Sequence, residues 1–140
     1  LPSPSPCCLR GRRGAGGENG VSLTGTALPC GRARANGVPI VKEWRLFYYK
    51  TKLLTNGFYW GSMIEEDIGK IPKEGEEFAN EVAKIVSTKT NFFVLDIAEK
   101  EEGGYILIEI NDGQQSGLSL CNPDELYANL KIELENEKFN

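Results

Sequence analysis

"NFFVLDIAEKEEGGYILIEIND", residues 91–112, has the pattern of two apolar strands joined by a short polar turn. We expect one strand over 91–99, a turn containing Glu102 and Gly103, and a second strand over 104–111. A hairpin with this turn places Asp96 directly opposite Glu109, with Asn111 two residues further along the same face. The surrounding side chains are apolar, so water would screen the repulsion between the two carboxylates poorly. A cation is therefore expected between them.

The chemistry of these three side chains indicates which cation. The sequence contains no histidine, which removes the commonest transition-metal ligand. Asp96, Glu109 and Asn111 offer two carboxylates and one amide oxygen, the donor set that suits Mg²⁺, or Mn²⁺ in its place. The alternative is that Glu109 pairs with Arg45 or a lysine, and that Asn111 only begins a turn. A one-residue slip in the strand register would scatter the three oxygen-bearing groups.

The rest of the chain from residue 38 onward predicts the other elements of one α+β domain. Residues 39–50 alternate as a strand does, with Trp44 facing one way and Arg45 the other. A tight turn near 50–52 returns the chain through "LLTNGFYWGS", in which Asn56-Gly57 is a turn signal of its own. Apolar residues at helical spacing predict an amphipathic helix over 73–87.

The last predicted element is a helix that begins at Asn122. Asn122 suits the N-cap, Pro123 the first helical position, and Glu125 the capping box, while Leu126 and Leu130 supply the buried stripe. The order of elements indicates an antiparallel sheet with helices packed on one face.

The composition changes abruptly near residue 37. Residues 1–37 hold eight glycines and four prolines, with five arginines against one glutamate, and contain no Lys, Ile, Phe, Tyr or Trp. Residues 38–140 hold ten lysines and one arginine against nineteen acidic residues, a net charge of −8. We expect 1–37 to be a low-complexity segment, disordered or non-native to the rest, because it lacks the apolar side chains needed to offset the entropy of ordering. We expect 38–140 to be the folded domain.

Composition also limits the partners and the compartment. A domain of charge −8 repels phosphate backbones, so we expect no nucleic-acid partner. No apolar run approaches the ~20 residues that span a bilayer, and no secretory signal is evident, so we expect no membrane association. The four cysteines form no CxxC pair, which disfavours a structural zinc site and favours a reducing, cytoplasmic setting.

The stretch "FFVLDIAEKEEGGYILIEINDGQQSG" (92–117) resembles the C-terminal metal-binding hairpin of ATP-grasp proteins, in which an Asp on one strand is followed by Glu-x-Asn on the next. The stretch "EWRLFYYKTKLL" (43–54) is similar to the preceding strand pair of that family. The resemblance covers roughly 37–135, and it is closest to the ATP-grasp families related to a eukaryotic translation-initiation assembly factor.

The resemblance implies a function and a role for each residue. Asp96, Glu109 and Asn111 would hold Mg²⁺ ions that bridge the phosphates of ATP, and Arg45 would contact those phosphates as the catalytic cation. The family generally joins a carboxylate to an amine or a similar nucleophile through an acyl-phosphate, and the loop 112–119 would face the acceptor, a small molecule or a protein.

One departure from the family pattern limits this expectation. ATP-grasp proteins clamp the nucleotide between two subdomains, and the low-complexity segment stands where the earlier subdomain is expected. The chain, which begins with Leu, therefore resembles the C-terminal part of an ATP-grasp ligase, a fragment incomplete by itself. The alternative function is a non-catalytic interaction domain that keeps the fold, with Glu109 in a structural ion pair.

Overall fold

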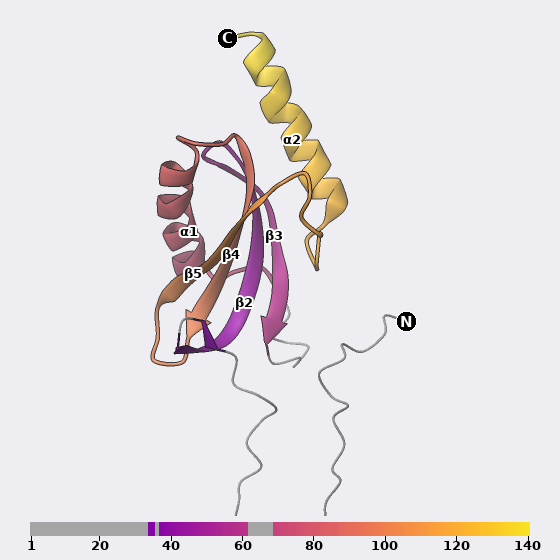
Figure 1. Cartoon of the computed structure of the whole chain (residues 1–140). Coiled ribbons are helices and arrows are strands. Elements are labelled where there is room, and N and C mark those ends of the chain that lie inside the picture. The colour runs from indigo at the N-terminus through magenta and orange to yellow at the C-terminus, as the bar shows by residue number, and fades with distance from the viewer. Residues whose placement is uncertain (1–33, 36, 62–68) are drawn as a thin grey trace, which may run out of the picture.

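The computed structural model describes residues 34–35, 37–61 and 69–140, which form one antiparallel sheet with two helices (Figure 1). The long strand β2 is central: it pairs with β3 on one side and with β4 on the other, and β4 pairs with β5. The elements are β1 (Arg34–Ala35), β2 (Val38–Tyr49), β3 (Lys52–Gly61), α1 (Lys73–Val86), β4 (Phe92–Lys100), β5 (Tyr105–Asp112) and α2 (Pro123–Lys138). The α+β class with an antiparallel sheet is confirmed.

The register of the β4–β5 hairpin matches the prediction where it matters for the site. Asp96 is the direct partner of Glu109, and Val94 is the partner of Asn111. A β-bulge follows immediately, between Asp96 and Ile97, because Ile97 pairs with Leu107 and leaves Ile108 as the extra residue. The predicted opposition of the two carboxylates is therefore confirmed, and the hairpin loses its regular register only beyond them.

The two helices lie on opposite sides of the sheet, so the expectation that both pack on one face is wrong in that detail (Figure 1). Alternation along β2 explains why, since each face of this central strand carries large apolar side chains. Trp44 and Tyr48 pack with Ala79 and Ala83 of α1, whereas the opposite face packs with Leu126 of α2. A sheet that is apolar on both faces must be covered on both.

Asn56-Gly57 is not a turn, contrary to the sequence pattern, because both residues lie inside β3. The Asn56 side chain is buried and accepts a hydrogen bond from the backbone N–H of Ile71 at 2.8 Å. A Cβ at Gly57 would stand 2.5 Å from the backbone of Leu120 and of Cys121. Glycine is used here for close approach of another chain segment, which brings the loop before α2 down onto the sheet.

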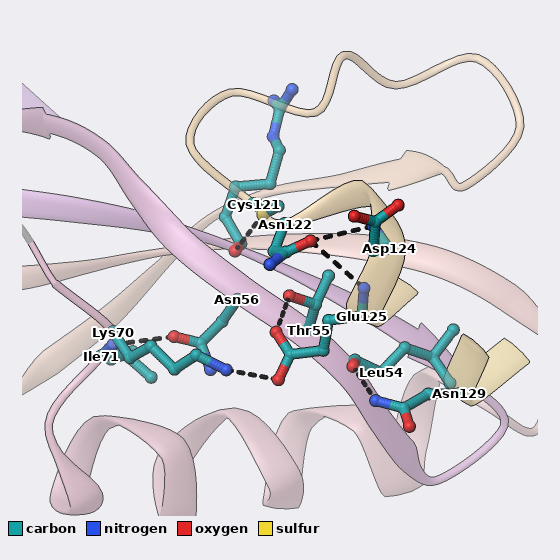
Figure 2. Close-up of polar contacts among 11 residues, drawn as sticks. Leu54, Thr55, Asn56, Lys70, Ile71, Cys121, Asn122, Asp124, Glu125 and Asn129 are labelled. Atoms are coloured by element: carbon teal, nitrogen blue, oxygen red, sulfur yellow. Dashed lines mark hydrogen bonds and ion pairs between the residues drawn. The ribbon is translucent and has the colours of Figure 1, made fainter. Parts of the chain in front are cut away.

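The start of α2 is fixed as the sequence predicts, with one change of partner (Figure 2). The Asn122 side chain accepts hydrogen bonds from the backbone N–H groups of Asp124 and Glu125, and Pro123 occupies the first turn. The Glu125 carboxylate accepts from Thr55 Oγ1 and Lys70 Nζ, both at 2.5 Å. It therefore ties the helix to β3 and to the segment before α1.

The segment 1–37 and its relation to the sheet are only partly accessible to description. β1 lies within it and pairs with the beginning of β2, through Arg34 opposite Pro39. The predicted disorder of the remainder falls on residues outside the described ranges and stays a prediction. No helix within the described residues is long and apolar enough to cross a membrane.

Candidate functional site

Arg45 and Asp96 form a bidentate ion pair at the centre of the sheet face that α2 partly covers. Arg45 Nε donates to Asp96 Oδ1 at 2.8 Å, and Nη2 donates to Oδ2 at 2.7 Å. The two residues are direct partners on β2 and β4, and their side chains are only 10% and 2% exposed. The hydrogen bond to Asp96 raises the pKa of Arg45, the opposing effect of burial being smaller. This fork-to-fork geometry fixes the orientation of the Asp96 carboxylate.

Arg45 also contacts other segments of the chain. Its Nη1 donates to the carbonyl oxygen of Gly117 at 2.9 Å, which holds the loop after β5. Its guanidinium carbon lies 4.6 Å from the centre of the Tyr59 ring on β3, within the range of a cation–π contact. The Cys121 thiol donates to the Arg45 carbonyl oxygen at 3.3 Å. Arg45 thus connects three strands with the loop 113–121.

Glu109 differs from Asp96 in its surroundings although it stands directly opposite. Its side chain is exposed, and within the described residues it has no hydrogen bond or ion pair. Asn111 is half-buried two residues further along β5. The alternative in which Glu109 pairs with Arg45 is therefore wrong, since Arg45 pairs with Asp96.

These three side chains fit a hard divalent cation. No group of three or more His, Cys, Asp or Glu side chains that could hold a metal occurs in the described part of the chain, so a protein-only cage is not formed. Asp96, Glu109 and Asn111 nevertheless present carboxylate and amide oxygens from adjacent strands on one face. A carboxylate that accepts two hydrogen bonds keeps unused lone pairs, so Asp96 can remain bound to Arg45 and still bind a metal ion. Mg²⁺ commonly takes one or two carboxylates and completes its shell with phosphates and water.

Glu43 is a third carboxyl group beside this pair, and it was not among the predicted site residues. It lies two residues before Arg45 on β2, so both side chains point to the same face, and it is 9% exposed. Burial raises the pKa of Glu43 from 4.5 to about 7, and the Asp96 carboxylate adds to the rise while Arg45 opposes it. The raised pKa shows that negative charge is already in excess at this position.

The loop after β5 forms one wall of a cleft next to Arg45. The cleft has a volume of about 410 Å³, and six residues line it: Arg45, Asn111, Asp112, Gln115, Ser116 and Gly117. The loop is shaped by its own hydrogen bonds, since the Asp112 carboxylate accepts from the Gln114 backbone N–H and its carbonyl accepts from the Ser116 hydroxyl. The opening of this cleft beside Asn111 agrees with the prediction that the loop borders a binding site.

Comparison with known proteins identifies the family. The sequence model of a family described as "ATP-grasp domain", the third family of its clade, matches residues 22–130, more than half of the chain. The chain belongs to this ATP-grasp family. The match confirms the resemblance read from the hairpin and the Arg45 strand, and it begins inside the segment 1–37, so the boundary at 37 stays a prediction.

Other comparisons add little about this ATP-grasp chain. None of the curated proteins matches it. Among solved structures it is similar to one described as "Structure of ATP-grasp ligase PsnB complexed with minimal precursor", with 15% sequence identity and a TM-score of 0.42. The similarity covers 66% of this chain and 35% of that chain, so the ATP-grasp chain described here spans about a third of the length of that ligase.

Sequence patterns foresaw some residues of the ATP-grasp site and missed others. The pairing of Asp96 with Glu109 followed from the hairpin, and Arg45 was expected on the same face. Glu43 could have been found, because it alternates with Arg45 on one strand. The carbonyl of Gly117 and the ring of Tyr59 could not, because loop closure and a β-bulge decide their positions.

Proposed function

We propose that residues 38–140 form the C-terminal subdomain of an ATP-grasp ligase and bind ATP with Mg²⁺ (or Mn²⁺) through Asp96, Glu109 and Asn111. The observation that carries this proposal is the direct opposition of Asp96 and Glu109 on adjacent strands, with Asn111 following on the same face, in a chain of the ATP-grasp family. The exposed carboxylate of Glu109 supports it, because a side chain with no partner among the described residues is free to meet a cation.

Each residue has a role that its environment supports. Asp96 is held rigidly by Arg45, so its second set of lone pairs points in a fixed direction. Glu109 and Asn111 complete one side of the coordination shell. Bound Mg²⁺ would neutralise the charge on the β- and γ-phosphate oxygens. Arg45 would add positive charge at the phosphates, with Nη1 exchanging the Gly117 carbonyl for a phosphate oxygen.

The reaction class follows the family. We propose that the complete enzyme joins a carboxylate to an amine or thiol through an acyl-phosphate, and that the cleft beside the loop 112–119 receives part of the acceptor. Phosphoryl transfer depends mainly on positioning and charge neutralisation, so the absence of histidine is no obstacle. We further propose a cytoplasmic location, which the free thiol of the buried Cys121 supports.

One observation favours the second candidate function, a non-catalytic interaction domain that keeps the fold. The buried Asp96 carboxylate is already neutralised by Arg45, so the fold does not need a metal to satisfy it. In that case the face would keep its geometry but bind nucleotide without regard to Mg²⁺, or not at all.

Calorimetric titration with a non-hydrolysable ATP analogue, with and without Mg²⁺, separates the two. We expect binding that requires Mg²⁺ and that weakens about 10-fold or more in Glu109→Gln and in Asn111→Ala. Both residues are at least partly exposed, so the variants should fold. Glu102→Gln, in the exposed hairpin turn, is the matched control and should bind as the unchanged chain does. Binding that ignores Mg²⁺ or both substitutions would establish the interaction domain instead.

A further inference from the structure

Two consecutive aromatic residues on β3 lie on the same face of the sheet as the candidate site. In a regular strand Tyr59 and Trp60 would point to opposite faces. A β-bulge between Glu43 and Trp44 changes this, because Trp60 pairs with Glu43 while Phe58 pairs with Trp44, and Tyr59 becomes the extra residue. Trp60 therefore shares the face of Glu43, and the ring of Tyr59 lies over Arg45 of that same face.

Both aromatic side chains are exposed, although aromatic residues elsewhere in this sheet are largely buried. Tyr59 is 47% exposed and Trp60 is 38% exposed, whereas Phe47 and Tyr48 on the neighbouring strand are essentially covered. One side of the Tyr59 ring is occupied by the Arg45 guanidinium, so a cation–π contact already forms there. The remaining aromatic surface of Tyr59 and Trp60 has the shape of a small open platform.

The charge next to this platform is negative. The charged groups that act on the Glu43 carboxyl are Asp96, Arg45 and Glu109, two anions and one cation. The single cation is fully engaged by Asp96, which leaves Glu43 and Glu109 without a positive partner of their own among the described residues. An aromatic surface beside uncompensated carboxylates attracts cations and repels anions.

We propose that Tyr59 and Trp60 form a recognition platform for a cationic nitrogen group, an alkylammonium or a guanidinium such as a lysine or arginine side chain carries, with Glu43 as its counter-charge. That this group belongs to the acceptor substrate rests on the proposed ligase function. The platform lies across Arg45 from Asp96, on the β3 side, whereas Glu109 and Asn111 lie on the β5 side. A ligand on the platform therefore leaves the metal-binding side chains uncovered, as a second substrate must.

The alternatives fit this surface less well. A nucleobase would also stack on the rings, but it would bring phosphate toward Glu43 and Glu109, where like charges repel. An apolar ligand would cover the rings and would bury Glu43 further without a counter-ion, which raises the cost of its charge. Only a cationic ligand gains from both the rings and the carboxylates.

The proposal is tested by proton–nitrogen NMR titration of the full chain, without nucleotide or Mg²⁺. The chain has two tryptophans, so the indole N–H region gives a signal for Trp60 on the platform and one for Trp44 in the core as an internal reference. The probes are N-acetyl-arginine amide against its neutral analogue N-acetyl-citrulline amide, and N-acetyl-lysine amide against N-acetyl-norleucine amide. We expect at least one cationic probe to shift the Trp60 signal saturably, with a Kd about fivefold or more below that of its neutral analogue, and to leave the Trp44 signal in place.

Substitutions then assign the effect to the rings. Tyr59→Leu should weaken binding of the cationic probe about threefold or more, whereas Tyr59→Phe, which keeps the ring, should bind within about twofold of the unchanged chain. Tyr127→Leu is the matched control, since Tyr127 is an exposed aromatic residue of α2 away from the platform. Equal affinity for cationic and neutral probes, no shift of Trp60 at any soluble concentration, or an equal effect of Tyr59→Leu and Tyr127→Leu would overturn the proposal. Because nucleotide and Mg²⁺ are absent, these results are independent of the nucleotide titration.

Discussion

Asp96 and Glu109 are direct partners on β4 and β5, yet their environments are opposite. Asp96 is 1% exposed and accepts two hydrogen bonds from the Arg45 guanidinium, while Glu109 is exposed and has no ion pair within the described residues. The asymmetry assigns different work to the two carboxylates. Asp96 contributes to the stability of the sheet, whereas Glu109 is free of any structural duty that would prevent it from binding a cation.

Neutralising the two carboxylates should therefore have unequal effects on stability. Asp96→Asn leaves the buried Arg45 without a counter-charge and should lower the free energy of unfolding by about 3 kcal/mol. Glu109→Gln removes an exposed charge that lies near two others and should change it by less than about 0.5 kcal/mol, toward greater stability. Urea unfolding without Mg²⁺ measures both. Equal losses in the two variants would show that Glu109 has a structural partner after all.

Gly57 should tolerate no side chain. The Cβ of Gly57→Ala would stand 2.5 Å from the backbone of Leu120 and Cys121, and backbone atoms cannot rotate away as a side-chain tip can. We expect a loss of about 1–3 kcal/mol in the free energy of unfolding, as for other overpacked sites. Gly69→Ala is the control, because nothing lies within 4 Å of a Cβ there, and it should change stability by less than about 0.5 kcal/mol. A neutral Gly57→Ala would mean that the loop before α2 moves freely.

The contrast between the hairpin and Gly57 shows what sequence could predict. Hydrophobic alternation and a short polar turn are local, so they fixed the strands over 92–112 and the opposition of Asp96 and Glu109. Asn-Gly is a local turn signal as well, but in β3 it is overruled by a contact with residues more than sixty positions away. The partners of Arg45 at Gly117 and Tyr59 depend on the same kind of long-range closure.

The placement of the helices failed for a related reason. The apolar stripe of each helix was evident, but a stripe does not state which face of the sheet it covers. The alternation of β2 held that information, since both of its faces carry large apolar side chains above and below Arg45. Two covered faces require two helices on opposite sides.

Glu43 should make the stability of the fold depend on pH. Its pKa is raised to about 7 in the folded chain, by burial first and by the Asp96 carboxylate second, against 4.5 when unfolded. Between these values the folded chain binds more protons at this group than the unfolded chain does, so the free energy of unfolding falls as the pH rises through that window. Glu43→Gln should remove this fall and be more stable by roughly 1–3 kcal/mol above pH 7. Urea unfolding of both proteins at pH 5 and pH 8 measures it, and parallel pH profiles would contradict the assignment.

Arg45→Lys should separate the two duties of Arg45, which are to neutralise Asp96 and to hold the loop. Lysine keeps one positive charge for the Asp96 carboxylate but cannot supply the fork that also reaches the Gly117 carbonyl, nor the planar stack on Tyr59. We expect a loss of about 1–3 kcal/mol in the free energy of unfolding, since one hydrogen bond to a charged group and part of a bidentate pair disappear. Backbone amide hydrogen exchange should rise in the loop 113–121, where Gly117 is released, and change little in α1, which packs on the other face. If exchange rises equally in both places, Arg45 acts only through global stability, and the connection from Asp96 through Arg45 to the loop plays no separate part in shaping the cleft.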